Sequence, residues 1–182
     1  IFRNTVQTTR GCPHDCGFCS VSAVFGKTVR HRPLDEIVQE IEGMVRGRRG
    51  FDRFVYFLDD NTGLPASWGK RLFKVLVPLN IHWMGETGVE TTDDDELLDL
   101  AAESGCTCLM LGFESLSREN LGMLGKSFLD PKRYDEAIKR IHRRGIAVYG
   151  FFIFGLGRDD DSVIRETVEW VQRNCVDLAQ FA

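Results

Sequence analysis

The sequence predicts an α/β fold, namely a partial (β/α)6 TIM-like barrel with parallel strands. Six short apolar runs, rich in β-branched and aromatic residues, alternate with longer segments of helical periodicity. Strands that alternate with helices are typical of βα units around a parallel sheet. A complete eightfold barrel needs about 250 residues, so six units in 182 residues favour an incomplete barrel. No glycine-rich phosphate-binding loop follows the first run, which disfavours an open nucleotide-binding sheet.

The predicted strands are the apolar runs, the first of which is "IFRNTVQT" at the start of the chain. In barrels of βα units, chemistry gathers at the carboxyl ends of the strands. Polar residues are frequent at these ends, and we expect them to meet on one rim of the barrel. The six predicted strands end near Thr8, Asp60, Thr87, Glu114, Phe154 and Phe181.

The predicted helices have apolar residues at i, i+3, i+4 and i+7 spacing and are delimited by capping residues. The first begins near Pro33, in keeping with the preference of proline for a first helical turn. The segment "TTDDDELLDLAAESG" starts with N-cap residues and stops at Gly105, and "DPKRYDEAIKRIHRRG" stops at Gly145. Helices are also expected after Pro65 and in "DDDSVIRETVEWVQRN". After Glu114, the next helix is expected only near Pro131.

Composition indicates an ordinary globular chain, with 43% apolar and 27% charged residues. A net charge of −4 gives no evidence for nucleic-acid binding. No stretch approaches the roughly 20 apolar residues of a membrane span, and no signal peptide is visible. Six cysteines without an export signal favour a reducing compartment, so we expect a cytoplasmic location. The chain starts at Ile1 without methionine and stops within an apolar run, so we expect it to be a fragment.

Three cysteines in "RGCPHDCGFCS", namely Cys12, Cys16 and Cys19, suggest one metal centre after the first strand. Structural zinc prefers four ligands, and His14 is too close to its neighbours to be an obvious fourth. A thiol redox pair of Cys16 and Cys19 leaves Cys12 unexplained. A 4Fe–4S cluster with three thiolates keeps one iron open, as a catalytic metal requires. The spacing favours the cluster, and zinc and the thiol pair stay as alternatives. The remaining cysteines, Cys106, Cys108 and Cys175, are expected to be small buried residues.

The pattern Cys12-x-x-x-Cys16-x-x-Cys19, with Phe18 before the last cysteine, resembles the signature of radical S-adenosylmethionine (radical SAM) enzymes. The segments "FVYFLDDN", "AAESGCTCLMLGFES", "LSRENLGMLGKS" and "IHRRGIAVYGFFIFGLGRDDDSVIRETVEW" resemble the branch that often carries an upstream cobalamin-binding domain. Residues 1–182 are then the radical SAM core domain, with the cobalamin-binding domain and a C-terminal region absent. The resemblance implies a partial (β/α)6 barrel that binds a 4Fe–4S cluster and S-adenosylmethionine. It also implies a one-electron donor such as flavodoxin or ferredoxin, and it leaves open whether the full-length protein binds cobalamin.

In this family the three thiolates hold three irons, and S-adenosylmethionine chelates the fourth. Electron transfer from the cluster cleaves a carbon–sulfur bond and yields a 5′-deoxyadenosyl radical, which starts chemistry on a substrate. The resemblance leaves the reaction open among methyl transfer, ring formation, methylthiolation and rearrangement. The alternative is a non-catalytic zinc or iron–sulfur binding module.

The resemblance also implies cofactor contacts. Asp59, Asp60 and Asn61 replace the Gly-Gly-Glu motif that meets the methionine amino group, and carboxylates suit an ammonium group. Glu114 and Ser115 match a motif that contacts the cofactor ribose or carboxylate.

Several further residues match the family pattern near the adenine or the cluster loop. Phe18 and Gly155 are expected beside the adenine, with a core role as the alternative for Phe18. Arg30 and Arg32 are expected to brace the cluster loop, with contacts to anions as the alternative. Lys126 is expected at the surface, with a contact to a substrate or to the cofactor carboxylate as the alternative.

Overall fold

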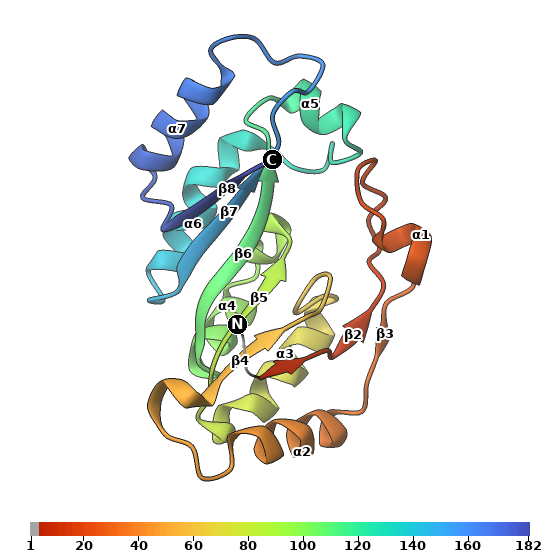
Figure 1. The fold of residues 1–182 in the computed structure, drawn as a ribbon, viewed down its shortest axis with the longest axis vertical. Helices are drawn as coiled ribbons and strands as arrows, with labels where there is room; N and C mark the ends of the chain where they lie inside the picture. Colours follow the sequence, from red (N-terminus) through yellow and green to blue (C-terminus); the bar gives the residue numbers. More distant parts are fainter. Residues whose placement is uncertain (1–3) are drawn as a thin grey trace.

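The computed structural model describes residues 4–182, so the first three residues of the first predicted strand lie outside the described residues. One sheet has the strand order β1–β4–β5–β6–β7–β8, and every neighbouring pair is parallel. This arrangement confirms the predicted α/β class with a parallel sheet. The strands β1 and β8 form the two edges, so the barrel is open (Figure 1). The strand bounds are β1 Thr5–Val6, β4 Phe54–Phe57, β5 His82–Thr87, β6 Cys106–Glu114, β7 Ala147–Phe152 and β8 Leu178–Phe181.

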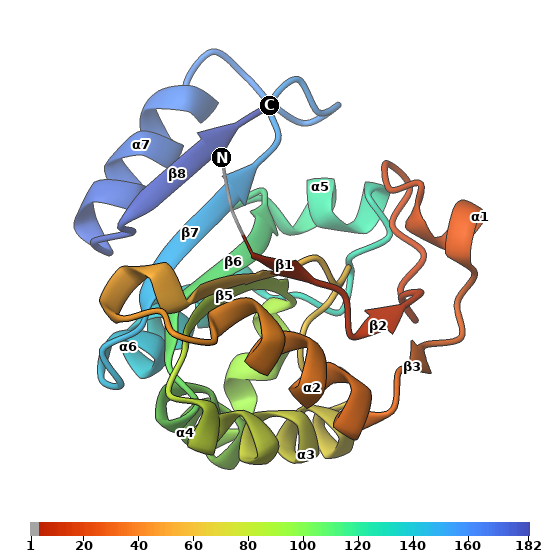
Figure 2. The same ribbon diagram turned by 60° about the horizontal axis from the view of Figure 1, so that its bottom comes forward.

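The five predicted helices are all present and lie outside the curved sheet (Figure 2). Their ends follow the expected capping chemistry, since the Asp94 side chain accepts a hydrogen bond from Leu97 N at 3.0 Å. Gly105 and Gly145 end two of the helices with φ of 91° and 71°, a conformation that favours glycine. The helix bounds are α2 Leu34–Val45, α3 Ala66–Leu76, α4 Asp95–Glu103, α6 Tyr134–His142 and α7 Val163–Arg173.

The core lies between the helices and the outer face of the sheet. Along β4, Val55 and Phe57 are fully buried towards the helices, whereas Tyr56 is half-buried on the opposite face. Phe113 in β6 packs edge-on against Trp170 in α7, with ring centroids 5.5 Å apart. Because successive strand residues point to opposite faces, the inner face of the barrel is left for ligands.

The structure adds elements that the sequence did not predict, namely α1 Val21–Phe25, α5 Arg118–Met123 and an antiparallel pair of β2 Thr9–Arg10 and β3 Arg30–His31. Short 3₁₀ helices cover Gly50–Arg53, Val77–Leu79, Val89–Asp93 and Pro131–Arg133. The expectation that no helix separates Glu114 from Pro131 is therefore wrong. The helix α5 is short and buries only Asn120 and Leu121, which explains its weak periodicity.

Hydropathy over the helices of residues 4–182 gives one further result. None of these helices combines the length and the apolar character needed to cross a membrane.

Candidate active site

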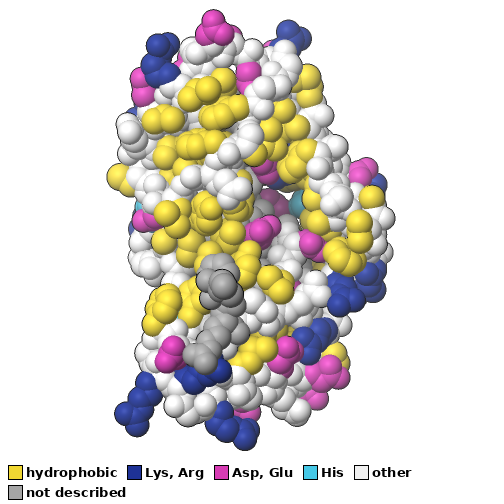
Figure 3. Space-filling model, in the orientation of Figure 1, with side chains coloured by type: hydrophobic (Ala, Val, Ile, Leu, Met, Phe, Trp, Pro, Cys, Tyr) yellow, Lys and Arg dark blue, Asp and Glu magenta, His cyan; other side chains and the backbone are white. Residues whose placement is uncertain are grey.

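A cavity of about 410 Å3 lies between the cysteine loop and the carboxyl ends of the inner strands. All three predicted ligands, Cys12, Cys16 and Cys19, line it. The opposite wall comes from the strand ends, which supply Asp60, Asn61 and Glu114 among others. Figure 3 shows the hollow between the loop and the sheet. The structure therefore brings the cysteine loop and three of the predicted polar residues to one place.

The cysteine loop has no regular structure and is fastened by backbone hydrogen bonds. Gly17 N donates to Leu124 O at 2.9 Å, and Cys12 N donates to Gly26 O at 3.4 Å. Partial burial raises the pKa of the Cys12 and Cys16 thiols, although the ammonium group of Lys126 opposes this effect at Cys16. Binding of a metal by these thiols must therefore displace protons. Among residues 4–182, no three His, Cys, Asp or Glu side chains converge as ligands of a single metal ion.

His14 anchors the loop instead of facing the cysteines as a ligand. Its Nε2 lies 2.8 Å from Glu90 Oε1, and its ring stacks on Phe128 with centroids 4.5 Å apart. Burial alone would raise the pKa of Glu90, but the hydrogen bond with His14, a backbone hydrogen bond and the charges of His14 and Lys126 together outweigh burial and lower the pKa. The contact joins the loop to the segment after β5, 76 positions along the chain.

Two tasks are divided among Asp59, Asp60 and Asn61, the polar residues that follow Leu58 after the end of β4. Asp59 is buried, does not line the cavity, and accepts hydrogen bonds from Thr8 N at 2.6 Å and Thr9 N at 2.9 Å. The Thr8 hydroxyl donates to the second Asp59 oxygen. Burial raises the pKa of Asp59 in spite of these donors. Asp59 thus ties the chain before the cysteine loop to β4, whereas Asp60 and Asn61 face the cavity.

A second carboxylate in the cavity is Glu86, near the carboxyl end of β5. Burial raises the pKa of Glu86, and repulsion by Asp60 and Glu114 raises it further. The cavity is therefore an acidic environment that favours a cationic ligand group.

Glu114 is held in the cavity wall by Lys126. The Lys126 Nζ to Glu114 Oε1 distance is 2.7 Å, and the two side chains are only 13% and 7% exposed. Lys126 also lies over the Phe18 ring, 5.7 Å from its centroid. The expectation of a surface Lys126 is wrong, because the loop after α5 folds back under the strand ends. Glu114 has a φ of 60°, which aims its side chain differently from a regular strand residue.

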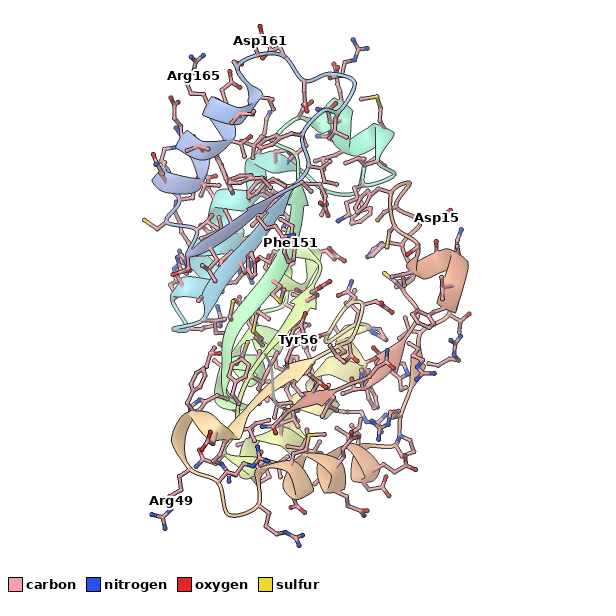
Figure 4. All side chains as sticks on the ribbon, viewed as in Figure 1. Asp15, Arg49, Tyr56, Phe151, Asp161 and Arg165 are labelled. Atoms are coloured by element: carbon pink, nitrogen blue, oxygen red, sulfur yellow. The ribbon has the colours of Figure 1, made fainter. Side chains whose placement is uncertain are left out.

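Ser115 and Gly155 lie outside the cavity lining. Ser115 Oγ accepts hydrogen bonds from Ser117 N at 3.1 Å and from Asn120 Nδ2 at 3.5 Å. Asn120 is fully buried and also donates to Asp159 Oδ1 at 2.7 Å, so Ser115 belongs to a network that joins α5 to the loop before α7. The strand β7 reaches the cavity through other residues, including Phe151 (Figure 4).

Sequence reasoning missed cavity residues that carry no local motif, such as Glu90, Met110, Phe128 and Phe151. For Phe151 a signal existed, since it lies at an inward position of β7, where buried and partly buried residues alternate.

Of the cysteines outside the loop, Cys106 is buried, Cys108 is half-buried and Cys175 is exposed. Burial raises the pKa of Cys108 to about 11. The expectation of burial is thus wrong for Cys175, which sits in the turn after α7 at a φ of 54°.

Comparison with known proteins relates the chain to one superfamily and to several methyltransferases. The profile of the radical SAM superfamily matches residues 6–171. Bacteriochlorophyllide d C-12(1)-methyltransferase of Chlorobaculum tepidum is 28% identical over 178 residues, which cover 97% of this chain and 39% of that protein. Cytidylyl-2-hydroxyethylphosphonate methyltransferase of Streptomyces wedmorensis is 33% identical over 152 residues, covering 83% of this chain and 28% of its own length.

Solved structures agree on the fold. The radical S-adenosylmethionine methyltransferase TsrM from Kitasatospora setae, with cobalamin and a [4Fe-4S] cluster bound, superposes with a TM-score of 0.88 at 18% identity. The match covers 98% of this chain and 36% of TsrM. OxsB, a cobalamin-dependent S-adenosylmethionine radical enzyme, gives a TM-score of 0.76 at 19% identity over 93% of this chain and 26% of its own.

Proposed function

Because the chain belongs to the radical SAM superfamily, we propose that it is a catalytic core that binds a 4Fe–4S cluster and reductively cleaves S-adenosylmethionine. The observation that carries the proposal is the position of three thiols on one wall of a cavity whose other wall holds carboxylates. Thiolates are the protein ligands of iron–sulfur clusters, so the donor set fits the group. Cys12, Cys16 and Cys19 would hold the cluster and leave one iron open.

The opposite wall fits the methionine part of S-adenosylmethionine. Asp60 and Asn61 face the cavity and would receive the amino group, whereas Asp59 would support them from below. Lys126 donates to Glu114 Oε1, and within residues 4–182 no hydrogen bond reaches Oε2. Glu114 would therefore present Oε2 to a ribose hydroxyl. Ser115 would act only through α5, because its hydroxyl points away from the cavity.

Phe18 and the β7 end would contact the adenine. Phe18 is 48% exposed although it lines the cavity, which supports a ligand role over a core role. Gly155, with a φ of 80°, would shape the turn after β7 that passes beside the base.

The bound cluster and S-adenosylmethionine would supply the carbon–sulfur cleavage, while the protein supplies position and exclusion of water. Here Lys126 fixes the Glu114 carboxylate, and His14 fixes the cysteine loop against Glu90. Apolar side chains such as Phe128 and Phe151 would limit water in the cavity.

The chain spans 39% of the length of the Chlorobaculum methyltransferase and 36% of the length of TsrM. The proposal for the whole protein is a cobalamin-dependent methyl transfer, supported by the methyltransferase activity of both relatives and by the cobalamin bound to TsrM. Such a reaction would need parts equivalent to the remaining lengths of those proteins, including a cobalamin-binding domain. The proposal includes a one-electron donor and a cytoplasmic location, where the cysteine ligands stay reduced.

The test is electron paramagnetic resonance of anaerobically reconstituted, dithionite-reduced protein, with and without S-adenosylmethionine. We expect a reduced cluster signal that changes when S-adenosylmethionine is added, together with cleavage of the cofactor. Cys16→Ala should lose the cluster and the cleavage, whereas Cys175→Ala should keep both, because Cys175 is exposed and outside the cavity.

Three results would contradict the proposal. A cluster signal that does not change when S-adenosylmethionine is added would indicate an iron–sulfur module without catalysis. A colourless protein that takes up zinc would indicate a zinc module. A reversible disulfide between Cys16 and Cys19 without metal uptake would indicate a thiol redox protein.

A further inference from the structure

An exposed basic patch lies on the outer side of the cysteine loop, on the antiparallel pair β2 and β3. A hollow of about 250 Å3 on this pair is lined by Arg10, Arg30 and Arg32, among other residues. We call these three arginines the hairpin patch. Figure 3 shows dark blue side chains gathered beside α1, β2 and β3. The patch shares no lining residue with the cavity that the three cysteines line.

Two of the patch cations face each other directly. Arg10 and Arg30 are paired across the antiparallel ladder, so both side chains leave the same face. In the other registered pair, Thr9 is buried, whereas His31 is exposed and packs on Trp68 with ring centroids 4.4 Å apart. Like charges directly opposite each other destabilise a strand pair. This arrangement therefore argues against a purely structural role for the two arginines.

No carboxylate of residues 4–182 neutralises these two arginines. Arg10 Nε donates to Gln7 Oε1 at 2.7 Å, and Arg30 donates to Phe25 O at 2.9 Å. Arg32, in contrast, pairs with Glu40 at 2.7 Å. In a chain of net charge −4, two uncompensated cations on one face form a local positive potential.

The position of the patch relates it to the cysteine loop. Arg10 is two positions before Cys12 in the sequence. Gly11 lies between them at a φ of 95°, and a Cβ there would meet Thr28 O at 2.5 Å. The loop and the strand pair are therefore in close contact, and the patch is adjacent to the cysteine loop in the chain.

We infer that the hairpin patch docks an acidic one-electron donor protein of the flavodoxin type beside the cluster, an inference that rests on the proposed function. Each encounter passes one electron, so the donor is oxidised by one electron and the cluster is reduced by one, with no bond made or broken. Electron-transfer complexes are small and short-lived, and complementary charges raise their association rate more than their affinity. Exposed arginines without carboxylate partners are suited to this task.

The test compares Arg10→Gln/Arg30→Gln with the unchanged protein, both with reconstituted clusters. The first readout is the association rate constant with reduced flavodoxin, measured by stopped flow at several salt concentrations. We expect a roughly tenfold lower rate constant at low salt and a weaker salt dependence. Arg10→Lys/Arg30→Lys should retain most of the rate, because steering depends on charge and not on guanidinium geometry.

The second readout separates docking from chemistry. Cleavage of S-adenosylmethionine driven by dithionite should be unchanged in Arg10→Gln/Arg30→Gln, because this small reductant needs no docking surface. Arg30 does not brace the cysteine loop as the sequence suggested, since its guanidinium donates to Phe25 O, and Arg10 donates to Gln7. The matched control is Arg46→Gln/Arg49→Gln, which removes two exposed arginines at the far end of the molecule, where Figure 4 labels Arg49. This control should keep the flavodoxin rate.

Three outcomes would overturn the inference. They are an unchanged flavodoxin rate in Arg10→Gln/Arg30→Gln, an equal loss in the Arg46→Gln/Arg49→Gln control, and an equal loss with dithionite. Loss of inorganic phosphate binding without loss of the flavodoxin rate would also overturn it and assign the hollow to a small anion. If the protein without substitutions does not cleave S-adenosylmethionine with dithionite, the proposed function is refuted. The association rate constant with flavodoxin would still test the docking surface in that case.

Discussion

Lys126→Met tests whether the Glu114–Lys126 pair holds the cavity wall. The two charges are 2.7 Å apart, and the side chains are 7% and 13% exposed, respectively. At an effective dielectric constant of about 20, their attraction across 2.7 Å is roughly 6 kcal/mol. Desolvation offsets much of that attraction. Removing Lys126 alone leaves a buried carboxylate without its cation, which should lower the free energy of unfolding by about 3 kcal/mol.

The assay is urea unfolding of the metal-free protein at neutral pH. Lys126→Met and Glu114→Gln should each destabilise the fold, and the double variant should lose clearly less than the sum, because neither charge then remains. The matched control is Lys27→Met, which breaks the exposed Lys27–Asp15 pair and should have little effect on stability, because water screens this pair. The reasoning fails if Lys126→Met costs no more than Lys27→Met, or if the two single effects simply add.

Two further predictions concern the same fold. Gly112→Ala would place a Cβ against the Glu114 carboxylate, so we expect a loss of roughly 1–3 kcal/mol in unfolding free energy and weaker S-adenosylmethionine binding by calorimetry. Gly122→Ala has no atom within 4 Å of the new Cβ and should be tolerated; equal losses would contradict the steric reason. Burial alone would raise the pKa of Asp177, but hydrogen bonds from a β7 amide and from His142 outweigh it and lower the pKa. Asp177 therefore stabilises the fold above its unfolded pKa of about 3.9, and this contribution disappears as pH falls, so Asp177→Asn should flatten the acid limb of a melting-temperature profile. An unchanged acid limb would show that Asp177 is not a determinant.

Local patterns along the chain were enough to predict much of the candidate site. The spacing of Cys12, Cys16 and Cys19 is a property of eleven consecutive residues, "RGCPHDCGFCS". The ends of the predicted strands located Asp60 and Glu114, and the parallel sheet brought both to the cavity. This inference succeeded because the carboxyl ends of parallel strands always meet at one edge.

Choices between neighbouring residues depended on the tertiary structure. Asp59 and Asp60 are equivalent in a sequence motif, yet Asp59 accepts hydrogen bonds from the chain after β1 and only Asp60 faces the cavity. Glu114 and Ser115 divide in the same way. The reason is that a strand end turns successive side chains in different directions, and packing decides which direction faces the ligand.

The sequence by itself determined the five longer helices, the order of the six sheet strands along the chain and the cysteine loop, because periodicity, capping and ligand spacing are local properties. The tertiary structure alone decided which distant residues meet. His14 reaches Glu90 across 76 positions, and Arg10 faces Arg30 across a strand pair of two residues each. Such contacts depend on the closure of long loops and on side-chain packing, neither of which leaves a periodic signal in the sequence.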